Sequence, residues 1–212
     1  MTIPPPLNAA SLALAVEDLA ARDPDLADIV ARLGSPPLWD RQPGFPTLLH
    51  IVLEQQVSLA SARAAFDRLR VVAEPLTPTR FLELSDTDLL AIGFSRQKAR
   101  YGRALAAAVD SGALDLDGLD RLDDDDVQRA LQAVPGIGPW TSTIYLLMAL
   151  GRPDVWPVGD IALAVSVGEV KGLGSRPDAA TMAELGEVWR PLRSVAARLL
   201  WHDYLARRGR AA

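Results

Sequence analysis

The chain has 212 residues, 49% of them apolar, which is enough to bury a core in one large domain or two small lobes. It has no cysteine, which excludes disulfides, iron–sulfur clusters and thiol catalysis, and its formal net charge of −5 argues mildly against a nucleic-acid partner. No apolar run approaches the length of a membrane span, and no export signal is visible at the N-terminus. We therefore expect a cytoplasmic protein with no membrane partner.

Helical patterns follow one another along the whole chain. Asp23 and Pro24 read as a cap followed by proline at the first helical position, and Gly34 ends that helix. The further predicted helices and helix starts are Pro46–Leu53, Ser58–Ala73, Thr77-Pro78, Ser85-Asp86, Ser95–Asp110, Asp123–Val134, Trp140–Leu150, Ile161–Val167, Asp178–Trp189 and Pro191–Arg207. No segment alternates apolar and polar residues for long, so the sequence predicts an all-α fold without a sheet.

Charge is unevenly distributed along the chain. From Trp189 to the end there is one acid, Asp203, and six arginines: Arg190, Arg193, Arg198, Arg207, Arg208 and Arg210. This arrangement permits a local basic face on an acidic protein. A second basic group near one helix start is either solvated surface or a set of phosphate contacts: Arg96, Lys98, Arg100 and Arg103.

The most informative stretch is a hairpin between two helical patterns, where Gly136 and Gly138 lie between Pro135 and Pro139. Glycines allow positive backbone angles and close approach by a ligand. The N–H groups at the start of the following helix add partial positive charge. The pattern favours a phosphate-binding hairpin, and the alternative is a helix–turn–helix corner without a ligand.

Asp160 lies directly before the helical pattern Ile161–Val167. Aspartate is common there as an N-cap. The helix dipole and backbone N–H groups keep such a carboxylate ionised, which suits the stabilisation of a cationic sugar or the alignment of a water. The two roles are compatible.

Tryptophans are prominent in a chain that is only 6% aromatic. We interpret Trp156 and Trp189 as core residues. Trp201 lies about half a turn from the apolar stripe of its helix, so we expect its ring to face a cleft, where indoles attract cations and stack on bases. The polar segment Glu54-Gln55-Gln56-Val57-Ser58 is either a plain connector between helices or a projection into a DNA groove.

Four segments together resemble the helix-hairpin-helix DNA glycosylases with a Gly/Pro-rich loop and following aspartate, and most of all their 3-methyladenine DNA glycosylase II branch. The resemblance runs from about Pro46 to Tyr204, although Leu192 stands where tryptophan is frequent. Its most specific parts are Val52-Leu-Glu-Gln-Gln-Val-Ser58, Val134-Pro-Gly-Ile-Gly-Pro-Trp-Thr141, Trp156-Pro-Val-Gly-Asp160 and Trp189-Arg-Pro-Leu-Arg-Ser194 with Trp201.

The resemblance implies one domain of two helical lobes, roughly 46–150 and 1–45 with 151–212, and an active-site cleft between them. Asp160 falls on the catalytic aspartate of the family. Trp140 and Trp201 fall on aromatic positions of the base pocket, and we add Tyr145, because a pocket tyrosine of some members falls on the adjacent Ile144.

The resemblance also implies a DNA-binding surface. Gln56 falls where the family inserts a side chain to fill the gap left by a flipped base. We assign the other DNA contacts to the hairpin residues Gly136, Ile137, Gly138 and Thr141. The backbone carbonyls of Gln132, Val134 and Ile137 match positions that hold a monovalent cation, Na⁺ or K⁺, whereas catalysis needs no cofactor.

The implied activity is hydrolysis of the N-glycosidic bond of alkylated purines, of the 3-methyladenine and 7-methylguanine type, in double-stranded DNA. Base flipping exposes the target, and an abasic site remains. Bifunctional relatives carry a nucleophilic lysine where this chain has Trp140, so we expect a monofunctional enzyme that acts as a monomer. The alternative is a non-catalytic helix-hairpin-helix protein that recognises damaged or abasic DNA, and Asp160 discriminates between the two. A helical interaction protein is a third, weaker interpretation.

Overall fold

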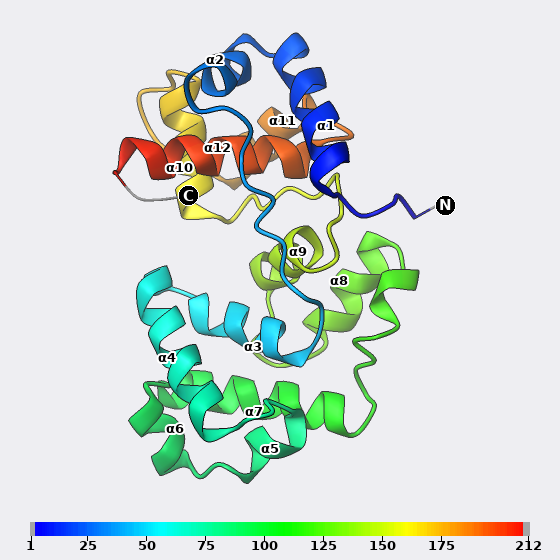
Figure 1. The fold of residues 1–212 in the computed structure, drawn as a ribbon, viewed down its shortest axis with the longest axis vertical. Helices are drawn as coiled ribbons and strands as arrows, with labels where there is room; N and C mark the ends of the chain where they lie inside the picture. Colours follow the sequence, from blue (N-terminus) through cyan, green and yellow to red (C-terminus); the bar gives the residue numbers. More distant parts are fainter. Residues whose placement is uncertain (1–2, 210–212) are drawn as a thin grey trace. The chain divides into compact units, whose positions relative to one another are not determined.

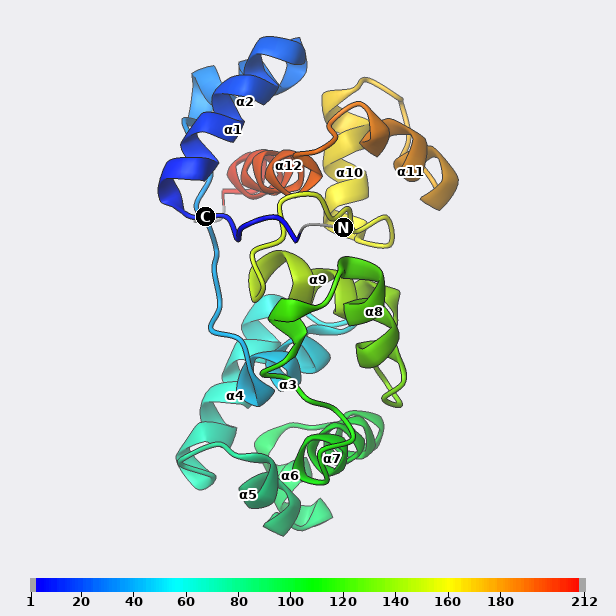
Figure 2. The same cartoon turned by 90° about the vertical axis from the view of Figure 1, so that its right-hand side faces the viewer.

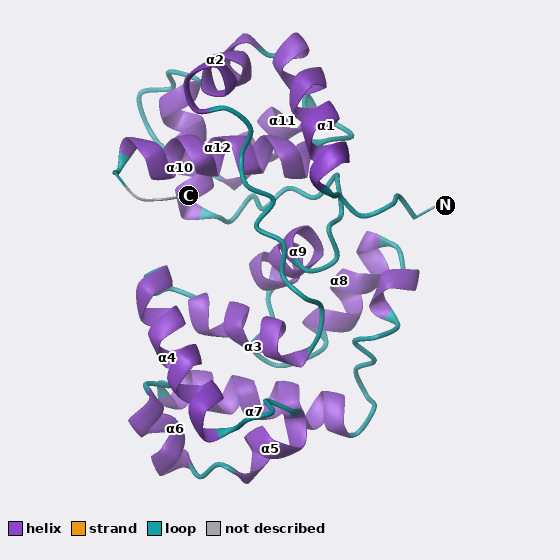
Figure 3. Ribbon diagram, in the orientation of Figure 1, coloured by secondary structure: helices purple, strands orange, loops and turns teal. Residues whose placement is uncertain are grey.

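The computed structural model describes residues 3–209, and within this range the chain is helical and has no strand (Figures 1 and 3). The predicted all-α fold is confirmed. The elements in chain order are α1 (Ala9–Arg22), α2 (Pro24–Leu33), α3 (Phe45–Glu54), α4 (Leu59–Val72), α5 (Pro78–Glu83), α6 (Asp86–Ile92), α7 (Arg96–Asp110), the 3₁₀ turn η1 (Leu119–Arg121), α8 (Asp124–Gln132), α9 (Pro139–Met148), α10 (Ile161–Val170), α11 (Ala179–Glu187) and α12 (Arg193–Arg207). None of the helices in the described range has the length and apolar character needed to cross a membrane.

The helices form two compact units. The first is Arg41–Tyr145, and the second comprises the described residues of Thr2–Asp40 and Leu146–Ala212. The boundary between Tyr145 and Leu146 falls inside α9, so this one helix contains residues of both units.

In the first unit, α3 supplies the centre of the core. Seven of its ten residues are buried, and it packs against α4 and α7. Close packing extends to α5, because Gly102 on α7 leaves room for the Phe81 ring: a Cβ atom at Gly102 would lie 2.7 Å from Phe81 Cζ. The buried face of α3 therefore fixes where its polar C-terminal end lies within this unit.

In the second unit, α12 is the central helix, with α1 and α2 on one side of it and α10 on the other (Figure 2). Every residue from Ser194 to Trp201 is buried. The helix is therefore buried beyond the predicted apolar stripe, and Trp201, which lies off that stripe, is only 8% exposed, because α1, α2, α10 and the segments at Leu38 and Val155 pack against α12.

A buried arginine on α12 shows how complete this enclosure is. Arg198 is 1% exposed and donates to the backbone carbonyls of Leu38, Ser194 and Leu147, at 2.8, 3.1 and 2.9 Å. Burial lowers the pKa of Arg198 to about 10. The side chain thus ties the N-terminal segment and the end of α9 to α12.

The C-terminal arginines do not form the basic face that the sequence permitted. Arg198 is buried, and the other four that the structure describes make ion pairs within the unit: Arg190 and Arg193 with Asp154 and Glu187, Arg207 with Asp203, and Arg208 with Glu169. Arg210 lies outside the described residues. These arginines make contacts inside the unit, and acids offset their charge.

The predicted helices all occur, but two elements were missed. Asn8 and Ser11 form a capping box at the start of α1, a signal that was readable in the sequence and was overlooked. The short turn η1 has no such signal, since no side chain caps it.

A buried aspartate joins three parts of the second unit. Asp23 caps α2 through the N–H groups of Asp25 and Leu26 and receives the Trp189 indole N–H at 2.7 Å. Lys171, at the end of α10, lies 2.8 Å from Oδ2 of both Asp23 and Asp25. Burial by itself raises the pKa of Asp23, but the hydrogen bonds from Lys171 and Trp189 outweigh this and hold the pKa below its ordinary value of 3.8.

We expect Asp23→Ala to lower the free energy of unfolding by about 3 kcal/mol at pH 7, because a cap is lost and Lys171 loses a partner. Urea unfolding measures it, and Asp18→Ala, which removes an exposed pair with Arg22, should change it by less than about 0.5 kcal/mol. Since the folded-state pKa of Asp23 is lowered, its contribution is complete above pH 3.8 and is lost as the pH falls through the folded-state value. A difference between wild type and variant that persists undiminished in strong acid would contradict this account.

Candidate functional site: a glycine hairpin and a capping aspartate

The two hairpin glycines differ in backbone conformation and in the space beside them. Gly136 has φ of 92°, and a Cβ atom there would lie 2.1 Å from Cγ of the Tyr101 ring. Gly138 does not have a positive φ, contrary to the expectation for both glycines, and a Cβ atom there would meet nothing within 4 Å. Gly136 is therefore needed for the fold of the hairpin, whereas Gly138 leaves open space beside the backbone.

The connector between α3 and α4 is attached to this hairpin. The Gln55 side-chain amide donates from Nε2 to the Gly136 carbonyl and to the Thr141 hydroxyl, both at 2.9 Å. Gln56, the next residue, is exposed and has φ of 56°. The segment is thus more than a plain connector. Sequence reasoning missed Gln55, since nothing in the pattern distinguishes it from Gln56.

The structure buries three predicted site residues of this unit, Ile137, Thr141 and Tyr145, and Ile137 is 5% exposed. Thr141 is 1% exposed and its hydroxyl accepts from Gln55, so its side chain is engaged inside the unit. Tyr145 has no exposed surface; its hydroxyl accepts from the Gly44 N–H at 2.9 Å, and burial raises its pKa. This placement does not support a pocket role for Tyr145. Trp140, at the start of α9, is half-buried.

The basic group on α7 divides into structural and exposed members. Lys98 donates from Nζ to the Leu53 carbonyl at the end of α3, and Arg103 pairs with Asp86 and donates to the Leu84 carbonyl. Arg96 and Arg100 are exposed. Lys98 and Arg103 therefore stabilise helix packing, and only the other two keep the open choice between solvated surface and phosphate contact.

In the second unit, Asp160 caps α10 as predicted. Its Oδ1 accepts from the Leu163 N–H at 2.8 Å and from the Trp201 indole N–H at 3.1 Å. The carboxylate is half-buried, and its neighbours Val158 and Ile161 are exposed. The structure thus brings Asp160 and Trp201 together, with the polar edge of the ring, which is 8% exposed, directed at the acid.

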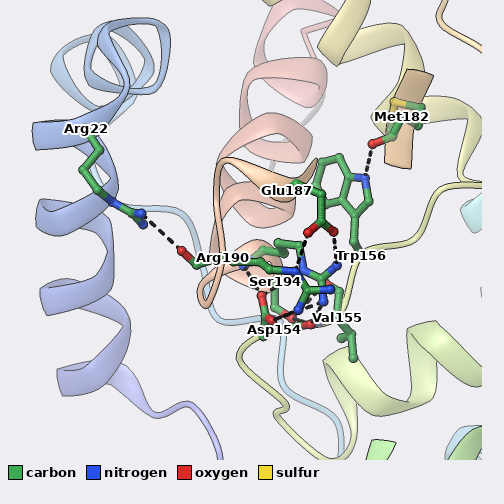
Figure 4. Close-up of polar contacts among 9 residues, drawn as sticks. Arg22, Asp154, Val155, Trp156, Met182, Glu187, Arg190 and Ser194 are labelled. Atoms are coloured by element: carbon green, nitrogen blue, oxygen red, sulfur yellow. Dashed lines mark hydrogen bonds and ion pairs between the residues drawn. The ribbon is translucent and has the colours of Figure 1, made fainter. Parts of the chain in front are cut away.

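The segment that leads to Asp160 is anchored residue by residue (Figure 4). Arg190 and Arg193 bind the Asp154 carboxylate. The Ser194 hydroxyl accepts from the Val155 N–H at 3.0 Å and lies 3.1 Å from the Val155 carbonyl, and the Trp156 indole donates to the Met182 carbonyl at 2.7 Å. Helix α12 therefore holds this loop at three places, through Arg193 at Asp154, Ser194 at Val155 and Trp201 at Asp160.

Trp156 and Trp189 are core residues, as predicted. They are 8% and 1% exposed, and their ring centroids lie 5.1 Å apart. Within residues 3–209, no three or more His, Cys, Asp or Glu side chains gather in a way that could hold a metal ion. The predicted cation ligands are of another kind, the backbone carbonyls of Gln132, Val134 and Ile137, which lie at the end of α8 and in the hairpin.

Known proteins are similar to this chain in both sequence and fold. The family model described as "HhH-GPD superfamily base excision DNA repair protein" matches residues 49–191. A putative DNA-3-methyladenine glycosylase of Bacillus subtilis, YfjP, is 33% identical over 126 residues, which are 59% of this chain and 44% of that protein. The chain thus spans less than half the length of this curated relative.

Two solved structures are similar over most of the chain. The 3-methyladenine DNA glycosylase Mag1 of Schizosaccharomyces pombe, in complex with abasic DNA, matches with a TM-score of 0.84 and 25% identity over 89% of this chain and 95% of Mag1. A DNA-3-methyladenine glycosidase of Bacillus halodurans matches with a TM-score of 0.74 and 30% identity, over 90% of this chain and 88% of that one. Together with the family match over residues 49–191, they establish that the chain belongs to the HhH-GPD superfamily of base excision DNA repair proteins.

Proposed function

We propose that the chain is a monofunctional DNA glycosylase that hydrolyses the N-glycosidic bond of alkylated purines, of the 3-methyladenine and 7-methylguanine type, in duplex DNA. The observation that carries the proposal is the Asp160 carboxylate, held at a helix N-terminus by the Leu163 N–H and by the indole of Trp201. The names of the similar proteins support the same substrate class.

The chemistry suits a fixed carboxylate. A purine alkylated on a ring nitrogen carries positive charge, so it leaves with the electron pair of the C1′–N bond as a neutral base. The sugar becomes cationic in the transition state, and the negative charge of Asp160 stabilises it there. Water then adds to C1′ and releases a proton, which leaves an abasic site. Hydrogen bonds to one carboxylate oxygen fix its direction before the substrate arrives.

Recognition of the base follows from its charge. An indole face attracts a positively charged base more strongly than it attracts a neutral base. Trp140 and Trp201 therefore favour an alkylated base over an undamaged one. Both lysines of the chain are engaged elsewhere, Lys98 with the Leu53 carbonyl and Lys171 with Asp23 and Asp25. Their engagement supports hydrolysis without a covalent amine intermediate.

We assign DNA binding to the hairpin and to Gln56. Gly138 leaves its backbone open to a phosphate, and the N-terminus of α9 directs partial positive charge toward it. Gln56, exposed at the end of α3, would fill the space left by the flipped base. A monomer bound in this way would act at the nucleoid.

A monovalent cation, Na⁺ or K⁺, fits the chemistry of the hairpin carbonyls. Gln132 is the last residue of α8, where helix carbonyls lack intrahelical partners, and Val134 and Ile137 follow it in the hairpin, where the Val134 carbonyl also accepts from the Ile137 N–H at 3.1 Å. Neutral carbonyl oxygens suit an ion of single charge. We propose that the carbonyls of Gln132, Val134 and Ile137 hold it. When bound, the cation would supply positive charge for a DNA phosphate.

The first test concerns Asp160→Asn. Asparagine keeps an oxygen for the Leu163 and Trp201 donors but has no charge, so the variant should fold normally and lose about 100-fold or more of its rate. Release of bases from methylated duplex DNA measures this loss. Binding to abasic DNA should be unchanged or tighter, because a negative charge is removed. Equal rates for variant and wild type would leave only the non-catalytic binding role.

The second test compares the two hairpin glycines. Gly138→Ala should change the free energy of unfolding by less than about 0.5 kcal/mol, since the new methyl group meets no protein atom. It should weaken DNA binding about 10-fold, because that space is reserved for the phosphate backbone. Gly136→Ala should instead destabilise the protein, because of its positive φ and the Tyr101 ring. DNA affinity as high in Gly138→Ala as in wild type would place the phosphate contact elsewhere.

The third test concerns mechanism class. Borohydride added during turnover should trap no covalent complex between protein and methylated DNA, since no lysine stands at the hairpin. A bifunctional glycosylase run in parallel supplies the positive control. A trapped adduct of this chain would contradict the monofunctional assignment.

A further inference from the structure

The C-terminal end of α3 is held by three successive residues. The Leu53 carbonyl accepts from Lys98 Nζ, and the buried Glu54 carboxylate makes a two-pronged pair with Arg41 at 2.9 and 3.0 Å. Gln55 then binds the hairpin through Gly136 and Thr141. Lys98 lies on α7, so the chain is fixed here to a helix, a loop and the hairpin.

This anchoring ends abruptly at Gln56. That residue has φ of 56°, a left-handed conformation that is unfavourable for glutamine and persists only where the surrounding structure imposes it. The exposed apolar residues Val57 and Leu59 follow, at 44% and 63% exposure. The connector therefore forms an exposed projection with apolar side chains, and Gln55 is the residue that ties its start to the hairpin.

We propose that Gln55 is a positioning residue that couples the projection carrying Gln56 to the DNA-binding hairpin. The inference rests on the proposed function and deepens it. Because one amide group binds both Gly136 and Thr141, the phosphate-binding backbone and the inserted side chain are held in a single geometry. Binding of the DNA backbone at the hairpin then places Gln56 at the correct depth to keep a flipped base out of the duplex.

The experiment uses the full chain and the variant Gln55→Glu, which keeps the size of the side chain but has no N–H group for the Gly136 carbonyl. Single-turnover release is measured for one alkylated purine, either paired with its normal partner or mispaired. A mispaired base costs less to flip, so it depends less on the inserted side chain. We expect a loss of about 10-fold on the paired target and a much smaller loss on the mispaired one.

Two further variants complete the comparison. Gln42→Ala removes an exposed glutamine of the same unit and should leave both rates unchanged. Thr141→Val removes one of the two acceptors and should give an intermediate loss with the same preference for the mispaired target. If Gln55→Glu unfolds, Thr141→Val decides. Equal losses on the two targets, or wild-type rates on both, would overturn the proposal.

A readout without catalysis separates this proposal from the proposed function. Duplex DNA with a tetrahydrofuran abasic analogue carries 2-aminopurine in the opposite strand, where insertion of a side chain alters its stacking and fluorescence. The wild type should change the fluorescence on binding, and Gln55→Glu should change it less at saturation. If the wild type releases no base but this difference remains, the proposed function fails and the role of Gln55 stands. Equal fluorescence changes would overturn that role.

Discussion

The burial of α12 is the constraint on which the second unit depends. Eight successive residues, Ser194–Trp201, are buried, and α1, α2 and α10 pack against the helix. A helix that is buried on all sides cannot shift without disrupting the core of the unit, so the side chains that project from it are held in fixed positions. Two of those groups reach the Asp160 loop: the Ser194 hydroxyl holds Val155, and the Trp201 indole holds the carboxylate itself. The proposed catalytic acid is therefore directed by the same helix that forms the core.

In the first unit, side-chain contacts hold the hairpin in place. Its hairpin is a short turn, and turns between helices are seldom rigid by themselves. Here the Tyr101 ring packs against Gly136, and Gln55 binds the carbonyl of the same residue. Contacts from α7 and from the α3–α4 connector thus meet at one glycine. Gly138, two residues later, has no protein atom near its open side. Gly136 is thus fixed by protein contacts, whereas Gly138 is accessible.

Charge in this acidic protein is arranged for packing as much as for binding. The sequence permits a local basic face at the clustered arginines near the C-terminus, but the described ones pair with Asp154, Glu187, Asp203 and Glu169 or are buried. Some partners lie far away in the sequence, as Asp154 does from Arg193, and others lie within one helical turn, as Asp203 does from Arg207. The sequence shows that the arginines are clustered, but it does not show which acids lie against them in the folded protein.

Local patterns were enough to predict the all-α fold, most helix starts and the order of the motifs, because caps, prolines and helical periodicity act over a few residues. They also placed Asp160 as an N-cap, which depends only on the residues that follow. Tertiary contacts made α12 buried over two whole turns, gave several arginines their acidic partners, and put Tyr145 in the core. They also decided that Gln55, and not its identical neighbour, binds the hairpin. Those outcomes depend on contacts between residues tens of positions apart, such as Gln55 with Gly136, and local pattern carries no information about such pairs.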